Sequence, residues 1–351
     1  MRVVVVGASG NVGTSLLERL AGDPEVELIL GLARRRPRLD VSKTDWAEAD
    51  VASSDLVPLF RGADAVVHLA WLIQPARDRR RLWRVNVDGS SRVFRAVADA
   101  GVPALVYASS VGVYSPGRKD RLVDESWPRE GIRSNGYSRE KAEVERRLDV
   151  FEREHPSVRV ARLRPGLIFK REAASGIRRL FAGPFLPSPL VRPELLSFFP
   201  DVAGLRFQAV HSLDVGEAYR LAVRSDAHGA FNVAAEPVLD SRVLARELDA
   251  RPVRVPPRVL RGLVGVSWRL HLQPTPPSWI DMALGVPLLD SSRARRELGW
   301  EPRRSGIEAF HELLEGMRER AGVETPPLAP DSGGPLRAKE LRTGVGSREE
   351  L

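Results

Sequence analysis

The stretch Val3-Val4-Val5-Val6-Gly7-Ala8-Ser9-Gly10-Asn11-Val12-Gly13 decides the fold of this 351-residue chain. Four consecutive β-branched residues are typical of a strand that is buried on both faces of a parallel sheet. The glycines that follow are spaced Gly-x-x-Gly-x-x-Gly, and an apolar-periodic segment through Leu16, Leu17 and Leu20 predicts a helix directly after them. Such a turn lets the backbone approach a pyrophosphate, which rests on the helix N-terminus. We therefore predict a dinucleotide site, the alternative being a merely tight strand–helix turn. Its residues would be Gly7, Ser9, Gly10, Asn11, Val12 and Gly13.

Strand and helix patterns alternate through most of the chain. Strands are expected at 26–32, 65–69, 104–108, 158–163, 207–211 and 230–233, and helices at 85–100, 135–154, 214–224, 241–250, 291–298 and 307–320. This alternation predicts an α/β fold of the Rossmann type, a doubly wound parallel sheet with a smaller C-terminal substrate-binding lobe.

The same patterns predict the domain boundaries. Residues 1–165 form the dinucleotide-binding domain, which 205–235 complete, and 166–204 with 236–323 form the substrate-binding lobe. A Pro-rich run at 273–277 is a rigid break. Residues 324–351 are rich in Pro, Gly, Ser and charge, and we expect a disordered tail there.

The end of the second predicted strand bears on the choice of dinucleotide. An NAD site usually has an acidic residue there, whereas this chain reads Gly31-Leu32-Ala33-Arg34-Arg35-Arg36, with no acid before Asp40. Guanidinium groups clamp a phosphate that a carboxylate would repel. Arg34 and Arg35 therefore favour NADP, with NAD as the alternative cofactor and a solvated basic turn as the bland interpretation. Asp50 and Val51 follow a loop and are expected to meet the adenine ring.

A second informative pattern is Tyr137-Ser138-Arg139-Glu140-Lys141, in which four positions separate the tyrosine from the lysine and so place both on one helix face. With 4 Tyr and 5 Lys in the chain, chance gives about 0.06 such pairs. An ammonium beside a phenol lowers the pKa of the phenol and equips it for acid–base chemistry. The competing interpretation is an exposed amphipathic helix.

Composition excludes several classes of site. The chain has no cysteine, and its six histidines lack metal-ligand spacing, so no metal site is expected. The formal net charge is +8, but the arginines are interleaved with acids, and we expect no nucleic-acid partner. No apolar run approaches the ~18 residues of a membrane span, and the N-terminal run is too short for a signal peptide. We therefore expect a cytoplasmic protein without membrane contact.

The glycine turn and the Tyr137/Lys141 pair together resemble the short-chain dehydrogenase/reductase superfamily. Further stretches look like its extended branch, which includes the NAD-dependent epimerase/dehydratase family, and they occur in the right order over residues 1–320. They are His68-Leu69-Ala70, Asn86-Val87-Asp88-Gly89-Ser90, Ala108 to Tyr114, Arg164-Pro165, Val210-His211 to Asp214-Val215, Asn232-Val233-Ala234, and Asp290 to Pro302.

This resemblance implies roles for individual residues. Tyr137 would be the general acid/base and Lys141 would hold the nicotinamide ribose and lower the tyrosine pKa. Ser110 would hydrogen-bond the reacting oxygen, and Asn86 would support the site from the neighbouring helix. The catalytic set is thus Ser110, Tyr137, Lys141 and Asn86, and Leu69, Ala70 and Pro165 join Tyr137 and Lys141 against the cofactor. The family also implies a homodimer through two long helices, one carrying Tyr137.

Departures from the family pattern bear on the substrate, which we expect to be a small molecule. Sugar-nucleotide dehydratases have Thr-Asp-Glu where this chain has Ser110-Val111-Gly112, and epimerases often have Asn where it has Leu167. The lobe is apolar at Leu180, Phe181, Phe185, Leu186, Leu195, Leu196, Phe198 and Phe199, although these side chains could be core.

These features favour an oxidoreductase acting on an uncharged alcohol or ketone. Arg192, Arg206 and Arg254 could instead hold a diphosphate and keep a sugar-nucleotide epimerase as the alternative. A non-enzymatic NADP-binding regulator is a third hypothesis.

Overall fold

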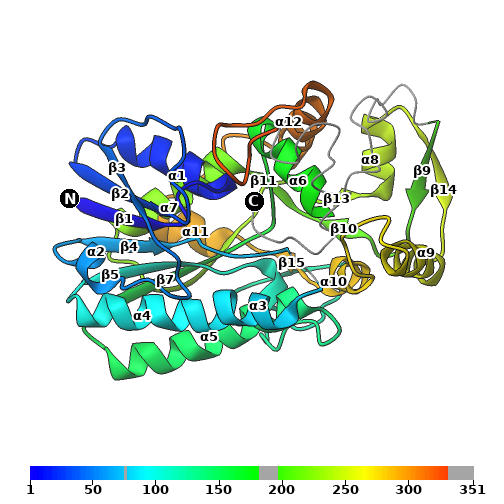
Figure 1. Cartoon of the computed structure of the whole chain (residues 1–351). Helices are drawn as coiled ribbons and strands as arrows, with labels where there is room; N and C mark the ends of the chain where they lie inside the picture. Colours follow the sequence, from blue (N-terminus) through cyan, green and yellow to red (C-terminus); the bar gives the residue numbers. More distant parts are fainter. Residues whose placement is uncertain (75–76, 182–196, 331–351) are drawn as a thin grey trace.

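A seven-stranded parallel sheet forms the centre of the molecule in the computed structural model, which describes residues 1–74, 77–181 and 197–330 (Figure 1). The strand order is β12-β7-β5-β4-β1-β2-β3. The chain crosses from one half of the sheet to the other beside β1, which confirms the predicted doubly wound Rossmann fold. The strands are β1 (Arg2–Val6), β2 (Leu28–Ala33), β3 (Thr44–Glu48), β4 (Ala65–His68), β5 (Ala104–Ala108), β7 (Arg159–Pro165) and β12 (Gly229–Val233).

Two helical layers cover the sheet, and β1 shows how its residues divide between them. Val3 and Val5 belong to one core cluster and Val4 and Val6 to the other, as the two-residue period of a strand requires. Both faces of β1 are buried, which explains the unbroken valine run. The first layer contains α1 (Asn11–Ala21), α7 (Ser212–Arg224) and α11 (Ser292–Leu298), and the second α2 (Val57–Phe60), α4 (Gly89–Asp99) and α5 (Gly136–Glu154).

The helix expected at 85–100 begins earlier and is irregular. It consists of α3 (Arg79–Trp83), a π-helical turn η1 (Arg84–Asp88) and α4. A π-helical turn is rare and often marks a functional position, and this one contains Asn86. Across the described ranges, no helix combines the length and the apolar composition that crossing a bilayer would require.

The remaining elements form the smaller lobe at the carboxyl ends of the strands (Figure 1). Two helices there were not predicted, α9 (Pro257–Arg269) and α10 (Ser278–Gly285). Gly262 and Gly265 interrupt the helical pattern of α9, and α10 is short and directly follows the predicted break at 273–277. The strand expected at 207–211 is split in two, β10 and β11. The elements are η2 (Val111–Val113), β6 (Leu122–Val123), β8 (Leu167–Phe169), η3 (Arg171–Ala173), α6 (Ala174–Phe181), β9 (Phe198–Asp201), β10 (Arg206–Phe207), β11 (Ala209–His211), β13 (Leu239–Asp240), α8 (Ser241–Glu247), β14 (Arg251–Arg254), α9 (Pro257–Arg269), α10 (Ser278–Gly285), β15 (Leu288–Leu289) and α12 (Gly306–Glu319).

The start of the expected disordered tail needs correction. Thr325 and Leu328 are buried. Arg179 of α6 donates to the carbonyl oxygen of Pro327 at 2.6 Å, and the backbone N–H of Arg38 donates to the carbonyl oxygen of Glu324 at 3.1 Å. Residues 324–330 are therefore packed against the fold, whereas 331–351 lie outside the described residues.

Candidate active site

A cavity of about 260 Å³ opens at the carboxyl ends of β1, β2 and β4, where ligands bind in doubly wound sheets. Nine of the residues predicted to contact the cofactor line it. They are Gly7, Ser9, Gly10, Arg34, Arg35, Asp50, Val51, Leu69 and Ala70. Gly176, Arg179, Leu180, Pro326 and Pro327 also line it. The sequence did not assign these five to the cofactor cavity, because they come from distant parts of the chain; Leu180 was named only among the apolar residues of the lobe.

The glycine turn fits a phosphate group closely. Gly7 has φ +89°, and a Cβ there would lie 2.7 Å from the backbone nitrogen of Ala70. A Cβ on Gly13 would lie 2.5 Å from the carbonyl oxygen of Ala8, so the helix can approach the turn only without a side chain. Gly10 is the N-cap of α1 and supplies no capping side chain. The first N–H groups of α1 are therefore available to an anion.

Asn11 and Val12 continue this turn into α1. The Oδ1 atom of Asn11 is buried and, within the described residues, accepts no hydrogen bond, while its Nδ2 donates to the carbonyl oxygen of Ile168 at 3.3 Å. An unpartnered buried acceptor of this kind is what a bound ligand donor would satisfy. The residues present thus fit a dinucleotide.

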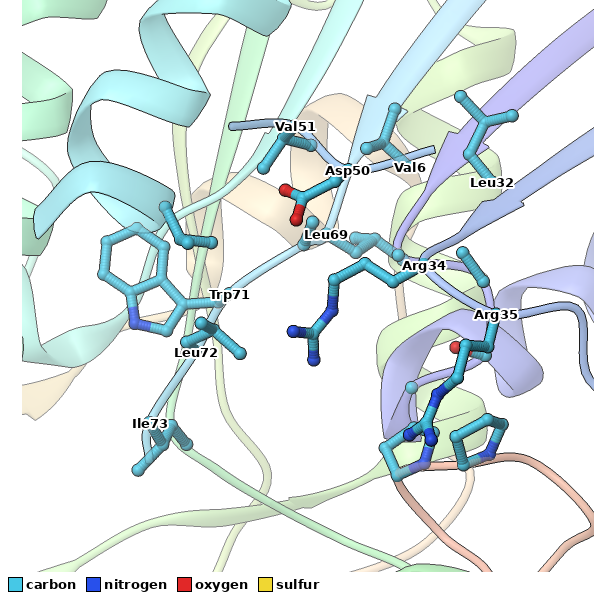
Figure 2. A pocket seen from close by; sticks show the side chains of 18 of the residues that line it. Val6, Leu32, Arg34, Arg35, Asp50, Val51, Leu69, Trp71, Leu72 and Ile73 are labelled. Carbon is cyan, nitrogen blue, oxygen red and sulfur yellow. The ribbon is translucent and has the colours of Figure 1, made fainter. Parts of the chain in front are cut away.

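Charged side chains surround the other end of the cavity. Figure 2 shows the side chains of Arg34 and Asp50 extending toward the same space, with Arg35 next to Arg34. Arg34 and Arg35 are exposed, so their guanidinium groups can meet a ligand phosphate. The carboxylate of Asp50 accepts a hydrogen bond from the backbone N–H of Ala52 at 2.8 Å and so also shapes its own turn.

Tyr137 and Ser110 are brought together from two separate elements. Asn135 caps α5 by accepting from the backbone N–H of Ser138 at 2.9 Å, which places Tyr137 in the first turn of the helix. Ser110 follows β5 and lies beside Tyr137: a Cβ on Gly112 would meet the tyrosine ring at 3.0 Å and the Ser110 Oγ at 3.4 Å. The Oγ of Ser110 accepts from the backbone N–H of Gly112 at 3.0 Å. The predicted proton-handling pair is therefore present in one site.

The electrostatics of this pair differ from the sequence-based expectation. Burial raises the pKa of Tyr137 to about 12; the Ser110 hydrogen bond opposes the rise and Glu140 adds to it. The ammonium of Lys141 lies 5.9 Å from the phenol ring centre, and its Nζ donates instead to the carbonyl oxygen of Ala108 at 2.6 Å. The tyrosine pKa is thus raised, because its burial away from water dominates.

Lys141 is itself an unusual group. Its Nζ lies 3.5 Å from the centre of the Trp71 ring, an arrangement that the ring quadrupole stabilises. Burial nevertheless lowers the pKa of Lys141 to about 7, against the carboxylates of Glu145 and Glu140, which raise it. Lysine therefore exchanges its proton near neutral pH here.

Asn86 acts on the site through the backbone of a neighbouring segment. Its Oδ1 accepts from the N–H of Leu72 at 2.7 Å, and its Nδ2 donates to the carbonyl oxygen of Leu72 at 2.8 Å and to Glu140 Oε2 at 2.8 Å. It is fully buried. Asn86 is a positioning residue. It fixes the backbone of Leu72, next to Trp71, and it holds the carboxylate of Glu140 on the helix that carries Tyr137 and Lys141.

Aromatic rings enclose Tyr137. Trp71 packs edge-on against it with ring centres 5.8 Å apart, and Trp279 lies 5.3 Å away on another side. Phe181 in turn packs against Trp279 at 5.0 Å. Sequence reasoning missed both tryptophans: Trp71 directly follows the quoted Leu69-Ala70, but Trp279 is more than 140 residues from Tyr137 and carries no local signal.

The arginines considered for a diphosphate are not gathered in the described part of the lobe. Arg206 donates to the carbonyl oxygen of Lys119, and Arg254 is exposed on β14. Arg192, like Phe185, Leu186, Leu195 and Leu196, lies outside the described residues. Pro165, the last residue of β7, is buried and pairs with Val233 in the sheet. Among the described residues, no group of three potential metal ligands occurs.

Comparison with known proteins places this site in a family. The profile of the NAD dependent epimerase/dehydratase family matches residues 3–180. An uncharacterized protein of Mycobacterium tuberculosis is 29% identical over 330 residues, which cover 92% of this chain but only 31% of that protein, so the chain spans less than a third of this relative.

Two further similarities concern enzymes with named activities. The sterol-4-alpha-carboxylate 3-dehydrogenase of Candida albicans is 28% identical over 191 residues, covering 50% of this chain and 54% of that enzyme. Among solved structures, the UDP-glucose 4-epimerase of Thermus thermophilus in complex with NAD superposes with a TM-score of 0.68 at 20% identity, covering 91% of this chain and 99% of that one. The latter shows the fold alone. With the family profile spanning half of the sequence, including the glycine turn and Tyr137, the chain belongs to the NAD dependent epimerase/dehydratase family.

Proposed function

We propose that this chain is an NADP-preferring oxidoreductase that interconverts an uncharged, apolar ketone and its alcohol. The observation that carries the proposal is the placement of Ser110 beside Tyr137, with Trp71 and Trp279 packed around the tyrosine. A proton donor surrounded by aromatic rings suits a substrate that brings no charge of its own, because a buried unpaired charge is strongly destabilised there.

The residues divide the chemistry between them. The dinucleotide, when bound, supplies or accepts the hydride at the substrate carbon. Tyr137, protonated at neutral pH because its pKa is raised to about 12, donates the proton to the substrate oxygen in the reductive direction. Ser110 orients that oxygen. The transfer leaves Tyr137 without its proton, and Lys141, whose pKa is near neutrality, supplies the proton that replaces it. Asn86 holds Leu72 and Glu140 in place.

NADP preference is supported by Arg34 and Arg35 at the cavity. Steady-state kinetics with NADPH and NADH tests it, and a clear preference for NADH would refute it. Arg34→Glu should reduce kcat/KM for NADPH by about tenfold or more, since a charge-assisted contact contributes about 1.5–3 kcal/mol. Arg36→Glu is the matched control, because Arg36 is equally exposed but does not line the cavity.

The substrate class is tested by NADPH oxidation with a panel of carbonyl compounds of increasing apolar size. Tyr137→Phe should abolish turnover while dinucleotide binding, measured by fluorescence titration, persists. Substantial residual turnover in that variant would overturn the assignment of the proton donor.

A sugar-nucleotide epimerase is the second candidate, since the Thermus thermophilus enzyme with this fold carries that name. Arg206 is already committed to a backbone carbonyl oxygen, which argues against a diphosphate there. An epimerase regenerates its cofactor in each cycle and would be purified with stoichiometric dinucleotide, whereas a reductase exchanges it. A homodimer through α4 and α5, which the family resemblance implies, is tested by light scattering.

A further inference from the structure

Helix α9 presents an apolar ridge to solvent at the outer end of the lobe (Figure 1). The ridge consists of Val259, Leu263, Val266 and the C-cap Leu270, which are 51%, 63%, 55% and 64% exposed. Their spacing of four, three and four residues places them on one face. An aligned set of large exposed apolar residues is unusual on a soluble surface and marks an interaction site.

The opposite face of α9 holds the helix to the protein. Arg261 pairs with Asp281 of α10 at 2.7 Å, and the guanidinium of Arg77 stacks over the Trp268 ring at 4.2 Å. Because these contacts fix the inner face, the ridge points away from the body of the molecule. The helix has no buried residue, so the ridge is not a misassigned part of the core.

The chain segment that carries the ridge has charges of one sign. Residues 250–280 contain five arginines and no aspartate or glutamate. Arg251, Arg254, Arg258 and Arg269 are exposed, and no carboxylate in the described part of the chain lies within ion-pair distance of them. Arg258 and Arg269 are eleven residues apart, about three helical turns, and so lie on the same flank of the ridge.

We propose that this surface docks the protein onto an anionic lipid bilayer. An amphipathic helix with an outward apolar face and flanking arginines lies in the membrane interface, its apolar residues at the acyl boundary and its guanidinium groups at the phosphates. A second copy of the chain fits less well, because pairing two such ridges would bring their arginines together without compensating acids. This peripheral contact revises the expectation of no membrane contact and does not depend on the proposed catalytic function.

The position of α9 connects the surface to the active site. The segment after α9 contacts the rim of the cavity: Pro274 accepts from Gln74 Nε2 at 3.3 Å, and Thr275 Oγ1 donates to the carbonyl oxygen of Phe181 at 2.8 Å. Trp279, which packs on Tyr137, follows in α10. In a protein docked through α9, only the segment after α9 and helix α10 would separate the bilayer from Tyr137. Apolar ketones and alcohols accumulate in the bilayer.

Flotation of the full chain with lipid vesicles tests the proposal. The wild type should float with phosphatidylcholine vesicles that contain phosphatidylglycerol and much less with phosphatidylcholine alone. The double variant Leu263→Ser/Val266→Ser should lower the partition coefficient by about tenfold or more, because each apolar side chain that is buried in the membrane stabilises the bound state. Arg258→Glu/Arg269→Glu should lower it by a similar factor and abolish its dependence on salt.

Matched controls come from α5. Val150→Ser removes a half-exposed helical apolar side chain, and Arg153→Glu reverses an exposed arginine in the last turn of that helix, as Arg269→Glu does in α9. Both should bind vesicles as the wild type does, and all variants should unfold at the wild-type temperature, since only exposed positions change. Failure of the wild type to float overturns the proposal. So does undiminished flotation of the ridge variants, or a wild-type dimer that these substitutions dissociate, which would assign the face to a second copy.

Discussion

Replacing Lys141 by Met is predicted to remove a pH-dependent penalty on folding. Burial lowers the pKa of Lys141 from 10.5 to about 7. Each pKa unit corresponds to about 1.4 kcal/mol, so a charged Lys141 destabilises the native state by roughly 5 kcal/mol relative to the neutral amine. The cause of this penalty is burial, which removes water from the ammonium group. Lys141 is only 3% exposed, so solvent does not screen the effect.

The sign follows from the two protonation states. Below pH 7 the native and unfolded states both carry the proton, and the native state bears the whole penalty. Between pH 7 and 10.5 the native state has lost the proton and the unfolded state has not. The destabilising effect of Lys141 is therefore fully relieved above pH 10.5. It returns step by step as the pH falls from 10.5 to 7. Over the range from pH 6 to pH 9, Lys141 should raise the free energy of unfolding by about 3 kcal/mol.

Urea unfolding of the cofactor-free protein at several pH values between 6 and 9 measures this dependence. The difference between wild type and Lys141→Met should change by about 3 kcal/mol across the range, with the variant gaining most at pH 6. Other groups titrate equally in both proteins and cancel. Lys43→Met is the control, since Lys43 is exposed and its replacement should leave the curve parallel to the wild type. Parallel curves for wild type and Lys141→Met would refute the reasoning, because they would mean that Lys141 keeps its proton in the native state.

Three further outcomes follow from the same geometry. Gly13→Ala should destabilise the protein by about 1–3 kcal/mol in urea unfolding and weaken dinucleotide binding, because its Cβ would lie 2.5 Å from two carbonyl oxygens. Gly22→Ala at the end of α1 is the control and should do neither, since its Cβ would lie 3.7 Å from the nearest atom, the carbonyl oxygen of Glu18. Asn86→Ala should lower kcat with little change in cofactor affinity and cost about 2–3 kcal/mol in thermal unfolding, because it leaves the Leu72 amide unpaired; unchanged kcat would contradict its positioning role. Dinucleotide binding at pH 8 should take up nearly one proton, seen by calorimetry in buffers of different ionisation enthalpy, since phosphate charge raises the pKa of Lys141 from about 7; an equal uptake in Lys141→Met would assign the proton elsewhere.

Local patterns predicted the parts of the fold that local interactions determine. The valine run, the glycine turn and the start of the helix at residue 135 each depend on a few neighbouring residues, so they could be predicted from the sequence. The strand β3 (Thr44–Glu48) escaped prediction because it lies at the sheet edge, where no face is fully buried and its residues are mixed.

Contacts between distant segments were beyond such patterns. The packing of residues 324–330 against α6 is one case, since a composition rich in Pro, Gly, Ser and charge predicted disorder from residue 324 onward. The indole of Trp71 over Lys141 is another: the four-residue spacing in α5 reveals that Tyr137 and Lys141 share a face, but not what covers it. The direction of the tyrosine pKa depended on that cover, and the sequence-based expectation of a lowered value was wrong for the cofactor-free protein.

The ionisable groups on the buried face of α5 explain why Lys141 in particular is left close to neutrality. Glu145 is also fully buried, and burial alone would raise its pKa, but the guanidinium of Arg164, with its Nε 2.8 Å from Oε1, holds that pKa below its usual value. Arg164 remains charged because the same pair stabilises it. Within the part of the chain that the structure describes, Lys141 has no carboxylate at hydrogen-bond distance and donates to a neutral carbonyl oxygen instead. Glu140, which accepts from Asn86 and forms no ion pair among the described residues, is likewise shifted toward its neutral form, because burial raises its pKa. Lys141 shifts in the same sense by losing its proton near neutral pH, and it lies one helical turn from Tyr137.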